Sequence, residues 1–389
     1  MSMKSISAVV LSLLAVAAPV SAQQRVFPLY TEALPVCAVG TIVNLGDIDP
    51  LVMQAIEVDR RDTGGLFVYS GSPEYALEPA ITYQDSFRAG DTVRVYVYHA
   101  NRAPIPLRFS IVLEPLSGPA AVDKINNVIT TPSRDYFGIG RLSAFIQLCR
   151  PTPPQPLRLN VDGPTILDKD LDAMVAIPGK PEFLIHTIHE FRVVSGAVRM
   201  SVVGVEADAD TIQRLPSLKI ADRDKNHDRA TVNGLTREIT AKAPYRTSDG
   251  PRHLRLQDGV GDPWMTGRDA TLDREQNYRG AYGVVFKMKF RLESPDGRHV
   301  ALLLNPRAGA LTGAVVEESL WKTQTGGLKT VRSASHAPSI GQGLIKEKTE
   351  GVVLGKWNPA ITPEVTVYWT PPATSSTPVE MILVPYTAP

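Results

Sequence analysis

Residues 222–228 carry oxygen-bearing side chains at alternate positions, as calcium-binding loops do. The four candidate calcium ligands are Asp222, Asp224, Asn226 and Asp228. An EF-hand loop also needs Gly at its sixth place and Glu at its twelfth. Here those places hold His227 and Asn233, and basic residues lie between the acids. We therefore interpret the segment as a charged, solvated loop, and a calcium site is the alternative.

A second candidate site lies in the segment Gly-Asp-Pro-Trp-Met-Thr-Gly at residues 261–267 and just after it. Trp264 could stack on a sugar ring, and Arg268 and Asp269 could bind polar groups beside it. We call these three residues the candidate loop. Residues 262–313 are rich in glycine, turn residues and alternating apolar positions, and they contain no nucleophile–base pair. The composition therefore favours a scaffold over a ligand site.

Two histidines have a spacing that resembles a zinc peptidase only superficially. Such an enzyme needs His-Glu-x-x-His on a helix, which puts both imidazoles on one face. His186 and His189 instead lie between apolar runs typical of a strand, where they would point to opposite faces. We predict no metal site here, and we assign no catalytic residue and no cofactor.

The beginning of the chain predicts export. Lys4 precedes an apolar run at residues 6–18, and small residues lead to Ala22. These are the parts of a cleavable signal peptide, and the run is too short to span a bilayer. Residues 1–22 are thus expected to be removed, leaving a chain without a transmembrane span. The mature protein would lie in the periplasm, at the cell surface or outside the cell.

The two cysteines, Cys37 and Cys149, are both in the expected mature chain. In an oxidising compartment they most simply form one disulfide. The alternative is two buried, unpaired thiols.

The charge balance excludes one class of partner. Removal of Lys4 with the signal peptide reduces the 41 basic residues to 40, which equals the number of acidic residues. A surface that binds phosphates needs an excess of Lys and Arg. We therefore expect no nucleic-acid partner, and envelope polysaccharides or envelope proteins are the partners that remain.

Most of the chain is predicted to form β-strands. The 32 prolines and 29 glycines leave little room for long helices. Between them lie runs with a period of two, which predict strands with one buried face; the clearest are residues 92–98, 107–113, 191–205, 282–292, 299–304, 365–369 and 379–384. Helices are expected only at 49–58 and 208–215. The fold class is all-β, with two β-sandwich-like domains and few short helices.

Three short turns predict β-hairpins. Ser-Pro-Asp-Gly at 294–297 would join the strands 282–292 and 299–304, and similar turns lie at 62–65 and 88–91. Two domain boundaries are compatible with the pattern. We divide the chain into residues 23–207 and 208–389, and the proline-rich segment at 151–157 is the alternative boundary.

Several blocks resemble a family of uncharacterised secreted bacterial proteins; some of its members are related to the N-terminal, stalk-like domain of copper amine oxidases. The blocks span roughly residues 65–389 and are 94–101, 132–135, 262–264, 267–271, 277–284, 304–309 with Gly313, 370–372 and 378–380. This chain has Ala281 and Ala308 where the family pattern has glycine. The resemblance implies no established activity, no catalytic residues and no copper.

Taken together, these features favour a secreted or cell-envelope protein with a structural, adhesive or binding role and without catalysis. The alternative is a carbohydrate-binding module or a secreted polysaccharide hydrolase. Exposed aromatic rings along a groove, or two carboxyl groups about 5–10 Å apart, would favour the alternative.

Overall fold

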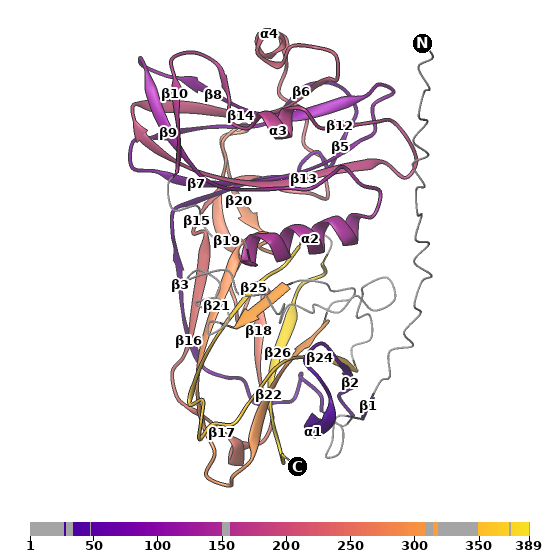
Figure 1. The fold of residues 1–389 in the computed structure, drawn as a ribbon, viewed down its shortest axis with the longest axis vertical. Coiled ribbons are helices and arrows are strands. Elements are labelled where there is room, and N and C mark those ends of the chain that lie inside the picture. Colours follow the sequence, from indigo (N-terminus) through magenta and orange to yellow (C-terminus); the bar gives the residue numbers. More distant parts are fainter. Residues whose placement is uncertain are drawn as a thin grey trace, which may run out of the picture.

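A computed structural model describes residues 27–28, 34–46, 48–149, 156–307, 314–317, 349–372 and 375–388. It confirms the all-β fold class. Figure 1 shows two layered regions, an upper one with strands running across the view and a lower one with strands running along the long axis. Helix α2 (Tyr136–Cys149) lies between them and contacts strands of both regions. Among the described residues, no helix is long and apolar enough to cross a membrane.

Two sheets face each other in the upper region. The smaller, which we call the β8 sheet, has the order β11-β8-β14-β6, and β12 also pairs with β8. Its strands are β6 (Ala80–Arg88), β8 (Leu107–Pro115), β11 (Thr165–Ile166), β12 (Val175–Ala176) and β14 (Ala197–Glu206).

The larger sheet, the β7 sheet, has the order β10-β9-β13-β7-β4-β15-β19-β20, and β5 also pairs with β7. Its β15, β19 and β20 end leaves the upper region and continues down beside α2 (Figure 1). Its strands are β4 (Leu66–Ser70), β5 (Tyr75–Ala76), β7 (Thr92–Asn101), β9 (Ala120–Ile129), β10 (Leu157–Val161), β13 (Phe183–Ser195), β15 (Arg229–Asn233), β19 (Met265–Asp269) and β20 (Arg274–Tyr278). Short helix α3 (Lys169–Asp172) contacts the β8 strand.

The lower region also consists of two packed sheets, which share one apolar core. The β22 sheet contains β1 (Phe27–Pro28), β2 (Ile42–Asn44), β24 (Glu350–Trp357), β22 (His299–Asn305), β26 (Val379–Tyr386) and β18 (Arg252–Leu256), in that order. The β21 sheet contains β23 (Ala314–Glu317), β25 (Glu364–Thr370), β21 (Val285–Glu293), β16 (Thr236–Ala241) and β3 (Val58–Thr63), and β17 (Tyr245–Arg246) also pairs with β21. Helix α1 (Leu34–Val36) packs on the other face of the β22 sheet.

The β7 sheet is buried on both faces, which differs from the one buried face that the alternation predicts. Val93, Val95 and Val97 belong to the upper core. Tyr96 and Tyr98, which point the other way, belong to the lower core rather than to solvent. The alternation along β7 therefore separates aliphatic from aromatic side chains, and one sheet joins the two cores.

The three predicted hairpins are wrong, although the turns themselves form. The turn at 294–297 leads from β21 to β22, the turn at 62–65 from β3 to β4, and the turn at 88–91 from β6 to β7. In each case the two strands belong to different sheets. A strand–turn–strand pattern looks the same whether the second strand pairs with the first or crosses to the facing sheet. The pair β19–β20 is a true hairpin, in which Met265 lies opposite Tyr278.

Strand pairing crosses the expected domain boundary at residue 207 in both directions. Strand β3, from the N-terminal part, pairs with β16 of the C-terminal part. Strand β15, from the C-terminal part, pairs with β4 of the N-terminal part. The division at 207 stays a prediction, and residues 151–155 of the alternative boundary lie outside the described residues.

One of the two predicted helices is confirmed, and the longest helix among the described residues was not predicted. Helix α4 (Thr211–Arg214) lies within 208–215, and the side chain of Asp210 caps its N-terminus by accepting from Gln213 N at 2.9 Å. Residues 49–58 form turns and the start of a strand instead. Helix α2 was missed because Gly138 and Gly140 are poor helix formers; Asp135 caps it by accepting from Gly138 N at 2.9 Å.

Cys37 is a buried, free thiol whose Sγ lies 3.5 Å from the carbonyl oxygen of Leu34. Burial raises its pKa. Cys37 forms no disulfide with any cysteine side chain that the structure describes, and the side chain of Cys149 lies outside the described residues. The pairing of the two cysteines stays a prediction.

Glycines of the resemblance block 277–284 have the backbone conformation that a Cβ disfavours. Gly280 has φ +82° and Gly283 has φ +78°. Ala281, where the family pattern has glycine, also has a positive φ of 45°. Gly309, for which we expect the same, lies outside the described residues.

We expect Gly283→Ala to destabilise the protein more than Gly297→Ala. Both positions have a positive φ, which costs an added Cβ about 1–2 kcal/mol. At Gly283 a Cβ would also lie 2.4 Å from the buried ring of Tyr96, whereas at Gly297 nothing lies within 4 Å. Overpacking adds roughly 1–3 kcal/mol. Urea unfolding of the two variants measures the difference, and equal losses would contradict the close approach.

Candidate functional site

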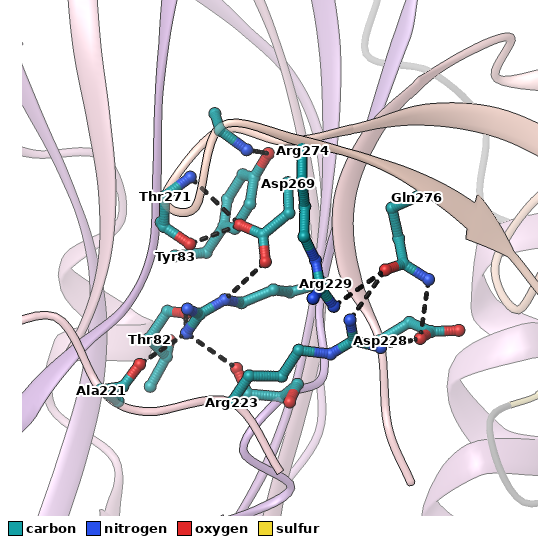
Figure 2. Close-up of polar contacts among 12 residues, drawn as sticks. Thr82, Tyr83, Ala221, Arg223, Asp228, Arg229, Asp269, Thr271, Arg274 and Gln276 are labelled. Atoms are coloured by element: carbon teal, nitrogen blue, oxygen red, sulfur yellow. Dashed lines mark hydrogen bonds and ion pairs between the residues drawn. The ribbon is translucent and has the colours of Figure 1, made fainter. Parts of the chain in front are cut away.

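The centre of the candidate site is a fully buried ion pair between Arg229 and Asp269. Nε of Arg229 lies 3.2 Å from Oδ2 of Asp269, and both side chains are 0% exposed. Arg229 begins β15 and Asp269 ends β19, so the pair joins two strands that are neighbours in the β7 sheet. Figure 2 shows the guanidinium of Arg229 also reaching the backbone: Nη1 donates to the carbonyl oxygens of Thr82 at 3.0 Å and Ala221 at 2.8 Å.

The second oxygen of Asp269 organises the turn that follows β19. Oδ1 accepts from the backbone N–H of Thr271 at 3.0 Å and from its hydroxyl. Beside it, the Tyr83 hydroxyl lies 2.8 Å from Thr231 Oγ1, which donates to Asp85 Oδ2 at 2.6 Å. Tyr83 and Asp85 come from β6 of the β8 sheet. These contacts tie the edge of the β8 sheet to β15 and β19.

The structure separates the three residues of the candidate loop. Asp269 is buried, because its carboxylate neutralises the buried Arg229 guanidinium. Arg268 is exposed and pairs with Asp273 in the β19–β20 hairpin. Trp264 is half-buried, and the Arg279 guanidinium lies 4.9 Å from the centre of its ring. The three side chains therefore do not form one binding surface.

The calcium candidates do not point to one centre either. Asp224 Oδ1 accepts from the backbone N–H groups of Asn226 and His227, each at 2.8 Å. Asp228 pairs instead with the Arg223 guanidinium at 2.5 Å. Asp222 and Asn226 are exposed. A guanidinium already occupies the position beside Asp228, and its charge opposes a second cation there.

Asp228 joins the candidate segment to the hairpin of Asp269, as Figure 2 shows. Gln276 on β20 donates from Nε2 to Asp228 Oδ1 at 3.0 Å and accepts from Arg223 Nη1 at 2.8 Å. Burial raises the pKa of Asp228, and the charge of Arg223 opposes that shift. The two sites predicted separately thus belong to one internal network around β15, β19 and β20.

Two further carboxylates of the resemblance blocks are also buried against cations. Asp262 Oδ1 lies 2.9 Å from Arg237 Nη1 and 3.1 Å from Arg60 Nε, and the Asp262 side chain is 0% exposed. Glu380 is equally buried and lies 2.8 Å from His253 and 2.6 Å from Arg255. Each carboxylate therefore joins different segments of the chain inside the protein.

The histidines at 186 and 189 are core residues on opposite faces of β13. His186 Nε2 lies 2.5 Å from Ser143 Oγ of α2, and its Nδ1 lies 3.1 Å from the Val97 carbonyl oxygen. His189 Nε2 lies 2.7 Å from Thr187 Oγ1. Burial lowers the pKa of each imidazole to about 4. Within the described residues, no group of three His, Cys, Asp or Glu side chains could hold a metal ion.

The arginines of these networks were missed by sequence reasoning. Arg229 and Arg237 each lie in a short alternating run, where a charged residue reads as solvent-facing. The signal that the sequence offers is a pair of acids, Asp262 and Asp269, in a block rich in glycine and turn residues. A single sequence shows which residues carry charge but not which of them share a buried pair.

Comparisons with known proteins give no family. No family model and no curated protein matches this sequence. One solved structure that the chain is compared with is the L499M mutant of the laccase from B. aclada, at 9% identity and a TM-score of 0.09. That alignment covers 73% of this chain and 47% of the laccase chain. A likeness at this level supports no inference about fold or activity.

Proposed function

We propose that this chain is an exported protein of the cell envelope or the extracellular space, with a structural, adhesive or binding role and no catalytic activity. Its partners would be envelope polysaccharides or envelope proteins. Kinship with the secreted bacterial family that its blocks resemble is part of this proposal.

One observation carries the proposal: acidic residues of the resemblance blocks hold the fold together. Asp262, Asp269 and Glu380 are all 0% exposed and paired with internal cations. A carboxylate that neutralises a buried arginine is not available to a substrate, because removing it would leave an unpaired charge in the protein interior. The blocks are therefore best explained as the framework of a large sheet assembly, which is what a structural or adhesive protein needs.

The proposal is tested by retention on the envelope. The mature chain is incubated with isolated cell-wall and membrane material from the producing cells, and bound protein is measured against its concentration. We expect saturable retention and no release of soluble sugars or peptides from the material. Release of soluble fragments would indicate a hydrolase, and retention lost in Trp264→Ala at unchanged melting temperature would assign binding to the candidate loop. The first result would contradict the proposal, and the second would contradict the interpretation of residues 262–313 as a scaffold.

Export makes a separate prediction about residues 1–22, which lie outside the described residues. Mass spectrometry of the protein collected outside the cytosol should give an N-terminus at Gln23, because the signal peptide is expected to be cut after Ala22. Replacing Ala22 with a bulky residue such as Trp should leave an uncut precursor. A mature protein that still begins at Met1 would contradict export.

A further inference from the structure

A cavity of about 200 Å³ lies where the two regions of the fold meet. Strands of the β7 sheet form one side, strands of the β21 sheet form the other, and the last turn of α2 closes an end; Figure 1 shows α2 in this position between the regions. The cavity is distinct from the Arg229–Asp269 network and from the candidate loop. Its lining combines apolar and polar side chains, which is the general composition of a small-molecule site.

Strand register fixes how the two sides are arranged. On the β7 sheet, Glu190 lies opposite both Arg94 and Asn126 in the pairing of β13 with β7 and β9. On the β21 sheet, Thr236 lies opposite Val285. Polar groups therefore face the cavity from both sheets, held on strands rather than on loops.

Hydrogen bonds hold the Arg94–Glu190 ion pair in place, and they leave one oxygen of Glu190 free to contact a ligand. Glu190 Oε2 accepts from Arg94 Nε at 3.0 Å and Nη2 at 2.9 Å, and Arg94 Nη1 donates to the Leu235 carbonyl oxygen at 2.9 Å. The Arg94 side chain is 12% exposed and the Glu190 side chain is 20% exposed. Gln147 of α2 donates to the Gly283 carbonyl oxygen at 2.7 Å, which ties the helix to the same place.

Four polar groups in this lining lack a protein partner within the part of the chain that the structure describes: Glu190 Oε1, Gln147 Oε1, the Asn126 amide Nδ2 and the Thr236 hydroxyl. They offer two acceptors, a donor and a group that can be either. The apolar part of the lining includes Leu148, Val285 and the ring of Tyr368. Because Arg94 neutralises Glu190, the cavity has no net charge.

We propose that this cavity binds a neutral, polyhydroxylated ring, that is, a single sugar residue. Hydroxyl groups both donate and accept, so one ring can satisfy Glu190, Asn126 and Thr236 while its apolar face packs on Tyr368 and Val285. A charged ligand would have no counter-charge, and an apolar ligand would leave the four polar groups unpaired. The volume, below the roughly 300–1,000 Å³ of larger ligand sites, suits one ring. The inference goes beyond the scaffold proposal and does not depend on it.

Calorimetric titration of the mature chain with glucose, galactose, mannose and N-acetylglucosamine tests the inference. We expect saturable binding of at least one of them at one site per chain. Thr236→Val should weaken that binding by roughly fivefold or more, because one hydrogen bond is lost. Thr240→Val is the matched control: Thr240 is exposed on the same strand and does not line the cavity. Trp264→Ala should bind as the wild type does.

Three results would overturn the inference. These are no saturable binding of any of the four sugars, binding that Thr236→Val leaves unchanged, and equal loss in both valine variants. The melting temperature of each variant is measured alongside, so that a folding defect is separated from a binding defect. Envelope retention uses a different readout, so failure of the sugar titration leaves the scaffold proposal standing.

Discussion

Replacing Asp269 with asparagine should destabilise the folded protein by about 3–5 kcal/mol, because it leaves the buried Arg229 guanidinium without its counter-charge. The change keeps the size and shape of the side chain, so the loss of charge dominates. Domains are typically stable by about 5–15 kcal/mol, and the variant would therefore be marginal at physiological temperature. Urea unfolding followed by circular dichroism measures the loss.

The same hairpin supplies a matched control for this substitution. Asp273 also pairs with an arginine, Arg268, but the two side chains are 80% and 60% exposed. Exposed ion pairs contribute little, so Asp273→Asn should change the free energy of unfolding by no more than about 0.5–1 kcal/mol. Similar losses for the two asparagine variants would show that burial of the Arg229–Asp269 pair is not what matters.

Acid should destabilise the protein well before the ordinary carboxylates titrate. Burial lowers the pKa values of His99, His186 and His189 to about 4, against roughly 6.5 in an unfolded chain. Below pH 6.5 the histidines of the unfolded state therefore bind protons, whereas those of the folded state stay neutral. Each histidine should remove about 2 kcal/mol of stability between pH 7 and pH 5. This loss of stability grows as the pH falls toward 4 and stays constant at lower pH.

His227 acts in the opposite direction and partly offsets this effect. Its bond to Glu74, with further help from Asp224, raises its pKa, so its contribution is present in acid and fades as the pH rises through the raised value. Unfolding free energies at pH 7, 6 and 5 should still fall steadily. His186→Gln should flatten that slope by about 1 kcal/mol per pH unit. A free energy of unfolding that is constant from pH 7 to 5 would contradict the neutral, buried imidazoles.

The sequence predicted which residues form strands better than how the strands pair. The period of two correctly marked residues 92–98 as part of β7, and glycine and proline marked the turns. Pairing could not be predicted, because the turns at 294–297 and 88–91 lead to a facing sheet. The choice between a hairpin and a crossing depends on long-range packing of the two cores, which no local pattern encodes.

Only part of the candidate site could be predicted, because its contacts also depend on long-range packing. The sequence located Asp269 and Asp228, and the structure places both in one network. Their arginine partners lie 40 and 5 residues away in the chain. Only the fold brings Arg229 to Asp269, and burial then turns an apparent surface acid into a structural one. No local pattern in the sequence indicates the cavity between the sheets, because its lining residues come from six different strands and from helix α2. Helix α2 was itself not predicted.

The central claim is that buried charged residues, such as Asp269 and its partner Arg229, stabilise the fold. A double-mutant cycle on these two residues tests that claim most directly. The free energy of unfolding is measured for the wild type, Arg229→Met, Asp269→Leu and the double variant. A buried pair predicts that the double variant is more stable than the sum of the single losses implies, with a coupling of about 1–3 kcal/mol. Losses that add, with a coupling near zero, would contradict the claim.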